Sequence, residues 1–417
     1  MFKAWVPIRE DDIIESIKVV ESTAFYILEQ SYESLFDLYK NQQNLLIDFL
    51  SYVFSLKNRR VHFAARGRSL YQGARTLAER MIQLGYNVIY PNLEQFIVYD
   101  PTATIIKDDI LIAFSTSGQT RKVIKKAHFA RKVGCDVIAI TANRESPLAK
   151  LSSPLPPIVF NPYFKRDRIL EKYDPTPFTP LGTTSEFIQL TFSESFASGL
   201  KEMQYNNIDP GQAFKVIKNV TTKLIEKARS NLTVTFSKSK EAIESFLANL
   251  ILKYYSQQTV HFCARGKTFN MAVGPFKMRL DQIPNAFVTS ILDFDPLNRP
   301  VRKGQVTITV SGSGMAYSIA KIAKDLGSML ISITSYENKL YEISDIVILV
   351  PGRKKVVLDQ ESDWDIRQWL GWTSEFAPEG TSFEVATAAL FDGIFAGLAN
   401  YIGITEEHMK EGHANIE

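Results

Sequence analysis

The chain has 417 residues, of which 45% are hydrophobic and 22% charged, and its formal net charge is +3. This length can form two or three domains with buried cores, and the balanced charge argues against a nucleic-acid-binding surface. Only Cys135 and Cys263 occur, so no disulfide framework is expected, and no uninterrupted apolar run reaches the roughly 18 residues of a membrane span. We therefore expect a cytoplasmic protein without a nucleic-acid or membrane partner.

The first half of the chain predicts helices followed by a parallel sheet. Helical sequence covers Asp11–Leu56, and the helix Arg121–Val133 is expected between two strands. The expected strands are the segment starting at Val61, then Asn87–Tyr90, Ile110–Phe114, Val137–Thr141 and Ile158–Phe160. Because strands alternate with helices, the sheet should be parallel and covered on both faces.

The second half repeats this pattern. The segment from Val260 to Thr268 echoes the segment from Val61 to Ser69, and helical sequence at about Pro210–Tyr255 precedes it. The remaining expected elements are strands at Ile283–Val288, Val306–Val310, Met329–Thr334 and Ile346–Val350, and a helix at Ser318–Leu326. We therefore predict an α/β protein whose two similar lobes pair as a pseudo-dimer around a pseudo-twofold axis.

The boundary between the lobes is placed at the polar stretch Asn206–Gly211. The first lobe then covers residues 1–207, with helices at 11–56 and a sheet core at 60–205. The second covers residues 208–417, with helices at 210–256, a sheet core at 259–403 and a tail at 404–417. Two long segments, Asn161–Thr179 and Pro351–Pro378, are expected to act as lids or interface loops, and the tryptophans of the second favour an interface.

Each lobe carries a Ser-x-Ser-Gly turn directly after an apolar strand. The turns, called the serine turns below, are Ser115-Thr116-Ser117-Gly118 and Ser311-Gly312-Ser313-Gly314. Hydroxyl groups and free amides at the start of a helix attract an anion, and Ser69 and Thr268 should lie at the same sheet edges. Serine and glycine also make good turns and helix caps, but the duplication and the extra hydroxyl of Thr120 favour a phosphate site in the first lobe. In the second lobe Ala316 replaces that threonine, and both interpretations stay open.

A Gly-Thr-x-x-Glu segment follows each serine turn later in the chain and ends at Glu186 or Glu384. Each glutamate begins an apolar helix, where the helix dipole alone would also favour an acidic residue. His62 and His261 lie inside apolar strands and are expected in the core. The basic runs Lys165–Arg168 and Arg353–Lys355 are interpreted as solvated loop charges, with the steering of an anionic sugar phosphate as the open alternative.

The order of a strand, Gly-Arg-Ser and Ser-x-Ser-Gly resembles the SIS family of sugar isomerase domains. Within it, the 6-phospho-3-hexuloisomerases are the nearest resemblance, and it covers both lobes. Three segments carry it: Thr179–Thr183 with Glu186, Pro351–Arg353 with the later Arg367-Gln368, and the ending Glu406–Glu417. The resemblance implies two doubly wound, mainly five-stranded parallel sheets.

The resemblance also implies isomerisation of a hexose or hexulose 6-phosphate through an enediol, without a metal or organic cofactor. Ser69, Ser115, Ser117 and Thr120 then correspond to phosphate ligands, with Thr116 donating an amide, and Thr268, Ser311 and Ser313 are their second-lobe counterparts. Glu186 or Glu384 corresponds to the base, and His413 to a residue that serves the partner domain's site. A buried carboxylate of raised pKa suits the transfer of a proton between neighbouring carbons.

The two lobes depart from the family pattern in different ways. The second lacks the threonine of its turn, and the first has Ile217 where the second has His413. We therefore expect one strong composite site, built from the first lobe's hydroxyls and the second lobe's His413. The rivals are a glucose or mannose 6-phosphate isomerase and a sugar-phosphate sensor that binds without turnover. Self-association is expected in the form of the internal pseudo-dimer, and a dimer of chains stays open.

Overall fold

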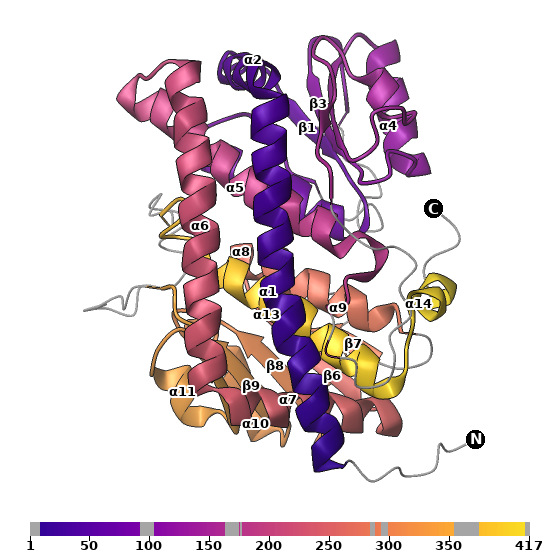
Figure 1. The fold of residues 1–417 in the computed structure, drawn as a ribbon, viewed down its shortest axis with the longest axis vertical. Coiled ribbons are helices and arrows are strands. Elements are labelled where there is room, and N and C mark those ends of the chain that lie inside the picture. Colours follow the sequence, from indigo (N-terminus) through magenta and orange to yellow (C-terminus); the bar gives the residue numbers. More distant parts are fainter. Residues whose placement is uncertain are drawn as a thin grey trace.

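The computed structural model describes residues 9–91, 104–162, 175, 177–283, 288–292, 299–353 and 375–412. Two five-stranded sheets, parallel throughout, form the centres of two lobes stacked along the long axis of the molecule (Figure 1). The first sheet has the order β2-β1-β3-β4-β5, with β1 at Val61–Ala64, β2 at Val88–Ile89, β3 at Ile110–Phe114, β4 at Asp136–Thr141 and β5 at Ile158–Val159. The second has the order β10-β9-β8-β6-β7, with β6 at Thr259–Cys263, β7 at Val288–Ile291, β8 at Val306–Val310, β9 at Met329–Thr334 and β10 at Ile346–Leu349.

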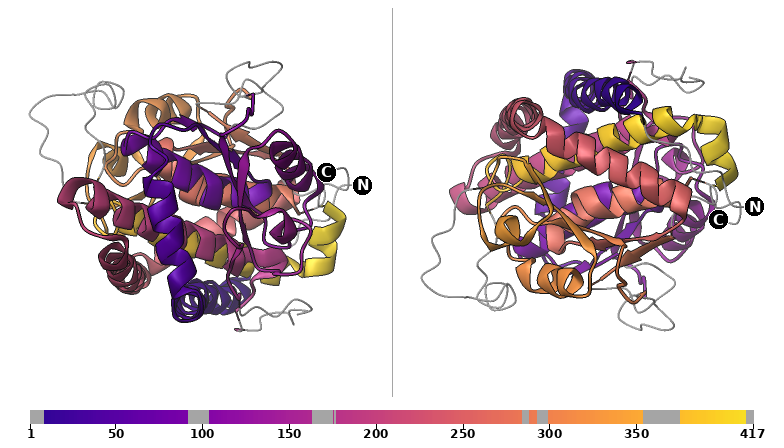
Figure 2. Two further views of the ribbon diagram at one scale, coloured as in Figure 1. Left: turned by 90° about the horizontal axis from the view of Figure 1, so that it is seen from above. Right: turned by 90° about the horizontal axis from the view of Figure 1, so that it is seen from below.

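Helices cover both sheets, as the two end-on views show (Figure 2). Those of the first half are α1 Glu10–Asn41, α2 Gln43–Phe54, the π-helix η1 Ser69–Arg75, α3 Thr76–Gln83, α4 Arg121–Lys132, the short 3-10 turns η4 Ala149–Leu151 and η5 Pro180–Gly182, and α5 Thr183–Asn206. Those of the second half are α6 Pro210–Lys238, α7 Lys240–Ser256, α8 Gly266–Thr268, the π-helix η6 Phe269–Val273, α9 Gly274–Asp281, α10 Tyr317–Asp325, α11 Lys339–Ile343, α13 Ser382–Ile402 and α14 Glu406–Gly412.

The strand orders confirm the predicted doubly wound fold and fix where a ligand can bind. In each sheet the chain runs outward from its first strand, β1 or β6, first to one side and then to the other. The resulting switch points lie between β1 and β3 and between β6 and β8, and open parallel sheets bind ligands at the carboxyl ends of the strands there. Ser69 follows β1 and Ser115 follows β3, so both residues lie at the first switch point.

The strands are apolar along most of their length because helices bury both faces of each sheet. Every residue of β1, β3, β6 and β8 is buried. The strand predicted at Ile283–Val288 is wrong at Ile283 and overlaps β7, Val288–Ile291, at Val288; residues 284–287 lie outside the described residues. The structure ends α9 at Asp281 and buries Ile283 just beyond it, so the apolar Ile283 belongs to the helix end and not to a strand.

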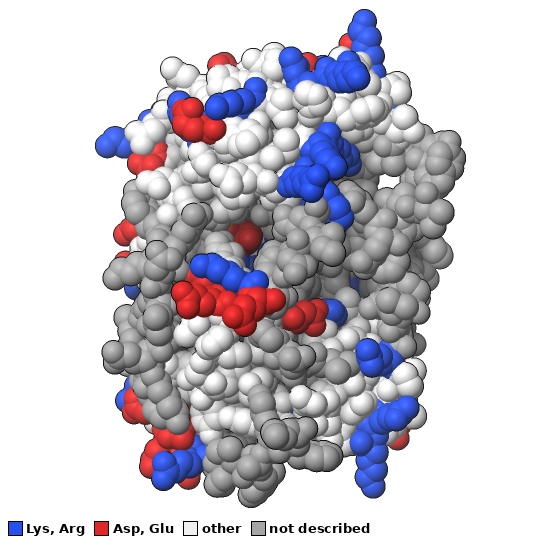
Figure 3. Space-filling model, turned by 90° about the vertical axis from the view of Figure 1, so that its right-hand side faces the viewer, with Lys and Arg blue, Asp and Glu red and all other residues white. Residues whose placement is uncertain are grey.

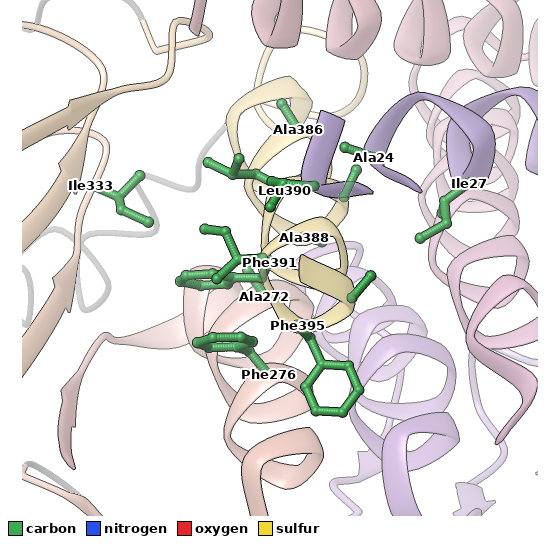
Figure 4. Packing of buried hydrophobic residues seen from close by; sticks show 14 of the residues in the cluster. Ala24, Ile27, Ala272, Phe276, Ile333, Ala386, Ala388, Leu390, Phe391 and Phe395 are labelled. Atoms are coloured by element: carbon green, nitrogen blue, oxygen red, sulfur yellow. The ribbon is translucent and has the colours of Figure 1, made fainter. Parts of the chain in front are cut away.

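The longest helices tie the two lobes together. The roughly 48 Å of α1 runs beside both sheets (Figure 1). Ile17 and Leu28 of this helix pack in the hydrophobic core of the second lobe, whereas Leu35 and Leu38 pack in that of the first. Ala24 of α1 lies against α13, where a Cβ at Gly393 would be 3.3 Å from Ala24 Cβ, and Figure 4 shows Ala24 in this hydrophobic cluster. The first helix of the chain therefore belongs to both cores.

The close crossing of α1 and α13 requires glycine. A Cβ atom at Gly393 would lie 2.4 Å from the Val20 carbonyl oxygen, and one at Gly397 would lie 2.5 Å from Val20 Cγ2. A matching crossing joins α5 and α6, where a Cβ at Gly199 would lie 2.7 Å from Ile217 Cγ1. The last long helix of each lobe thus packs against the first helix of the other lobe.

The proposed boundary at residues 207 and 208 falls between α5 and α6. Asp209 caps α6 by accepting a hydrogen bond of 2.9 Å from the Gln212 amide. Dividing the chain there into two lobes remains a prediction, because α1 and α6 contribute to both cores. In the described part of the chain, α13 is long and apolar enough to cross a membrane, but 94% of that stretch is buried inside the protein.

Candidate functional site

The first serine turn gathers three of the predicted hydroxyl groups. Ser115 Oγ accepts a hydrogen bond of 3.1 Å from the Gly118 amide and lies 3.0 Å from Thr120 Oγ1. Ser117 Oγ accepts one of 3.1 Å from the Gln119 amide. A Cβ at Gly118 would lie 2.0 Å from a neighbouring serine oxygen, and its φ is +64°, so only glycine fits. The turn therefore holds its hydroxyls together in front of α4.

Ser69 lies at the start of the π-helix η1, directly after Arg68. Its side chain is buried, and η6 repeats the π-helix in the second lobe next to Thr268. Nothing in the sequence indicated π-helical turns, which occur frequently at functional sites. The structure thus places Arg68 and Ser69 together just beyond the carboxyl end of β1.

Glu186 lies close to the first serine turn because α5 begins beside it. Gln189 Nε2 of this helix donates a hydrogen bond of 3.2 Å to Thr116 Oγ1. A Cβ at Gly182 would lie 3.8 Å from Thr116 Cγ2 and 3.9 Å from both Glu186 carboxylate oxygens. Gly182 therefore lies next to both the serine turn and the Glu186 carboxylate.

The Glu186 carboxylate is buried and forms an ion pair with Arg68. Arg68 Nη1 also donates a hydrogen bond of 3.4 Å to Asp392 Oδ1 of α13. Burial raises the pKa of Glu186; the charges of Arg68 and Arg279 oppose this shift, and that of Asp392 adds to it. Because α13 and Arg279 belong to the second lobe, the surroundings of Glu186 contain charges from both lobes.

The second lobe surrounds Glu384 differently. Its Oε1 forms an ion pair with Arg353 and accepts a hydrogen bond of 3.1 Å from Thr268 Oγ1. Burial alone would raise the pKa of Glu384, but the charges of Arg353 and Lys267 outweigh it and lower the pKa. Burial lowers the pKa of the Lys267 amine to about 7, with the charge of Arg80 adding to that shift.

Arg353 also lies against the second serine turn. A Cβ at Gly312 would lie 2.6 Å from Arg353 Cγ, so the arginine stem occupies the space above this glycine. The prediction that Arg353 is a solvated loop charge was therefore wrong: its side chain is 22% exposed and its charge is paired with a buried carboxylate. Lys354, Lys355 and the run Lys165–Arg168 lie outside the described residues.

His413 also lies outside the described residues, so the structure places only the helix before it. That helix, α14, ends at Gly412 and lies beside η5, the turn that leads into the helix of Glu186.

Figure 3 shows one face of the molecule, where charged side chains gather across the middle beside a hollow. His62 and His261 are confirmed as core residues, 1% and 0% exposed.

A separate hollow of about 400 Å³ lies at the far end of α4 from the serine turn. It is lined by His128, Arg131, Lys132, Lys150, Leu151, Ser152 and Ser153. Its basic side chains are exposed, and cations near the C-terminus of a helix are stabilised by the helix dipole. This explanation is sufficient, and we assign the hollow no part in the site.

Comparison with known proteins agrees with this geometry. The family profile described as "SIS domain" matches residues 56–155. An uncharacterised protein of Aeropyrum pernix is 33% identical over 180 residues, which cover 42% of this chain and 82% of that protein. A 3-hexulose-6-phosphate isomerase of Methanocaldococcus jannaschii is 27% identical over 204 residues, 48% of this chain and 95% of the relative. An uncharacterised HTH-type transcriptional regulator of Thermotoga maritima is 26% identical over 137 residues, 33% of this chain and 42% of the relative.

Solved structures share the two-sheet arrangement. The tagatose-6-phosphate ketose/aldose isomerase of Escherichia coli superposes with a TM-score of 0.58 at 14% identity, over 97% of this chain and 98% of the other. At this identity the likeness establishes the fold. Fold and relatives together define a phosphosugar-isomerase-like α/β protein. The chain belongs to the SIS-domain family.

Proposed function

We propose that the protein isomerises a hexose or hexulose 6-phosphate and that the first lobe carries the reaction. The observation that supports this most directly is the proximity of a buried carboxylate of raised pKa, Glu186, to the hydroxyl-rich serine turn. The relationship to a 3-hexulose-6-phosphate isomerase points to the reaction class. A 3-hexulose 6-phosphate is accordingly the substrate that we expect to be used best.

In this mechanism the substrate's phosphate binds to Ser69, Ser115, Ser117 and Thr120, with the Thr116 amide as a further donor. Glu186 removes a proton from the carbon next to the carbonyl and returns it to the neighbouring carbon after the enediol has formed. Burial raises the pKa of this carboxyl, which makes the carboxylate a stronger base once it is ionised. Arg68 holds the carboxylate in place through their ion pair.

His413 of the second lobe would complete this site by serving the sugar oxygens. The position of α14 beside η5 supports this assignment, because the helix ends one residue before His413 and close to the turn that precedes Glu186. A neutral imidazole at that position can donate or accept the proton of an enediol oxygen.

The second lobe is proposed to bind phosphate weakly and not to turn over. Thr268, Ser311 and Ser313 keep a set of hydroxyls, but Arg353 occupies the space over Gly312 and pairs with Glu384. A carboxylate whose pKa is lowered by two cations is a weak base at neutral pH. We accordingly assign Glu384 no proton transfer.

A sensor that binds a sugar phosphate without turnover is the second candidate. It is favoured by the paired state of Glu384 and by the relationship to an HTH-type regulator. A glucose or mannose 6-phosphate isomerase differs from the main proposal only in the sugar.

The test is proton exchange in deuterated water, followed by NMR at the carbon next to the carbonyl for 3-hexulose, fructose, glucose and mannose 6-phosphates. Exchange that is lost in Ser115→Ala/Ser117→Ala, together with sugar-phosphate binding, supports a first-lobe isomerase, and the fastest sugar identifies the substrate. Saturable binding without exchange for any sugar would favour the sensor. Undiminished binding of fructose 6-phosphate by the double variant would contradict the phosphate site.

A further inference from the structure

Two arginines at equivalent positions of the two lobes are among the largest fully buried side chains of the described chain. Arg80 lies on α3 and Arg279 on α9, the α-helices that follow the π-helix of each lobe, and both are 0% exposed. Each donates from Nη1 to a glutamine further along its chain segment, Gln83 at 2.9 Å and Gln282 at 3.2 Å. Taking a guanidinium out of water is costly unless its donors are used, so their other partners are informative.

Each arginine reaches into the opposite lobe. Arg80 Nη2 donates to Thr381 Oγ1 at 2.9 Å, in the segment that leads to Glu384. Arg279 Nη2 donates to the Pro180 carbonyl at 2.5 Å and to Thr183 Oγ1, in the segment that leads to Glu186. The Gly-Thr-x-x-Glu segment of each lobe is therefore held by an arginine of the other lobe.

Arg80 and Arg279 differ in the remaining hydrogen-bond partners of their guanidinium groups. Arg80 forms a two-pronged ion pair with Glu194, at 2.8 and 2.7 Å. At the position equivalent to Glu194 the second lobe has Asp392, whose side chain is one methylene shorter and accepts a hydrogen bond from Arg68. Arg279 Nε has no hydrogen-bond partner among the described residues. The hydrogen bonds that Arg279 makes across the lobe boundary are directed at the turn in front of Glu186.

That turn has a conformation that needs support. Leu181 has a φ of +50° and Gly182 one of +77°, and a left-handed conformation is unfavourable for leucine. Thr183 Oγ1 donates to the Pro180 carbonyl at 2.7 Å and accepts from both Arg279 and Arg68. Three bonds therefore meet at one hydroxyl at the start of α5 and fix the first turn of the helix that carries Glu186.

We propose that Arg279 of the second lobe is a positioning residue for the first lobe's site. It holds the turn from Pro180 to Thr183 so that Glu186 faces the serine turn, while Ser115, Ser117 and Thr120 keep hydrogen bonds within their own turn between β3 and α4. The first lobe's site is thus incomplete without the second lobe, independently of any contribution from the tail. This inference rests on the proposed function, since it assigns the proton transfer to Glu186.

The experiment replaces Arg279 with Ala and Thr183 with Val, and measures kcat and KM of proton exchange with the best sugar. We expect kcat to fall about 100-fold in each variant, because a misplacement of about 1 Å at a reacting group has that effect. KM should change less than about threefold, since the hydrogen bonds within the serine turn do not involve Arg279 or Thr183. Guanidinium ions added to Arg279→Ala should restore part of kcat, and Thr183→Ser should keep most of it.

Thr381→Val is the matched control, because Thr381 holds the equivalent place in the second lobe. The loss of kcat that it causes should be about tenfold smaller than that of Thr183→Val. Circular dichroism and the free energy of unfolding of each variant separate misplacement from unfolding, and Thr183→Val carries the test where Arg279→Ala does not fold.

Equal losses from the two threonine variants, an effect on KM alone, or full kcat in a folded Arg279→Ala would overturn the positioning role. These outcomes are distinguishable from failure of the proposed function. If Ser115→Ala/Ser117→Ala also keeps full exchange, the assignment of the reaction to the first lobe has failed, whatever the Arg279 variants do.

Discussion

The two lobes share one fold but surround their central carboxylates in opposite ways. Glu186 is paired with Arg68, which also contacts Asp392, and burial raises its pKa. Burial would raise the pKa of Glu384 as well, but its pairing with Arg353 and the nearby charge of Lys267 lower it. A carboxylate's environment, rather than its position in a motif, thus decides whether it suits proton transfer.

The pKa shifts have the opposite directions at the two carboxyl groups that lie two turns further along the same helices. Burial would raise the pKa of Glu194 on α5, but the charge of Arg80 outweighs it and the pKa is lowered. Burial raises the pKa of Asp392 on α13, against the charges of Arg68 and Arg279. The Arg80–Glu194 ion pair therefore supports the Gly-Thr-x-x-Glu segment of the second lobe through Thr381. The longer contact between Arg68 and Asp392 lies beside Glu186 of the first lobe. The carboxyl of raised pKa is thus the first of the two on α5, Glu186, but the second of the two on α13, Asp392.

The largest expected effect comes from removing the proposed base, Glu186. Glu186→Gln should lower the rate of proton exchange roughly 100- to 10,000-fold, the usual contribution of a general base. Glu384→Gln should lower it less than about threefold, because the lowered pKa of that carboxyl makes it the weaker base. NMR of exchange in deuterated water measures both. Equal losses in the two variants would show two working sites and remove the asymmetry.

The second prediction concerns stability and compares Glu194 with Asp392. Glu194→Gln leaves Arg80 without its buried counter-ion and should lower the free energy of unfolding by about 3–5 kcal/mol, as measured in urea. Asp392→Asn should cost clearly less, because the hydrogen bond that Asp392 accepts from Arg68 is 3.4 Å long. A cost as large as that of Glu194→Gln would show that the two lobes are braced equally.

The pH dependence of this stability follows from the lowered pKa of Glu194. A carboxyl whose pKa is lower in the folded protein stabilises it above the ordinary carboxyl pKa, and this contribution is lost as pH falls through the folded value. The difference between wild type and Glu194→Gln should therefore be largest near neutral pH and shrink in acid. Urea unfolding at a series of pH values measures it, and a constant difference would contradict the ion pair.

The sheets and serine turns could be predicted from sequence because local patterns determine them. Apolar runs bounded by turn residues predicted nearly all strands, and Ser115, Ser117 and Thr120 are close neighbours in the chain, so one turn brings their hydroxyls together. The pairing of Arg353 with Glu384 was not predictable, because it depends on how the chain after β10 crosses the second serine turn. No local pattern encodes such a contact.

The hydrogen bonds from Arg80 and Arg279 to the opposite lobe could not be predicted from the sequence either. Arg80 and Arg279 lie in helices where a charged residue usually faces solvent, and only the stacking of the lobes buries them against Thr381 and Thr183. The sequence repeat predicts two similar lobes, but each arginine's partner belongs to the other copy. Contacts across a pseudo-twofold axis leave no periodic signal within either copy.

The smallest expected effect is a shift in the pH dependence of exchange. In the proposed mechanism Glu186 acts as a carboxylate, so the rate should rise with pH through its pKa, and burial places that rise above the ordinary range of a glutamate. The charges facing it are Arg68, Arg279 and Asp392, and the negative charge of Asp392 raises the pKa further. Asp392→Asn should therefore move the acid limb of kcat to lower pH, by less than about one unit, because Asp392 is the weakest of these influences. A shift to higher pH in this variant would mean that Asp392 acts mainly by holding Arg68 against Glu186, and not through its charge.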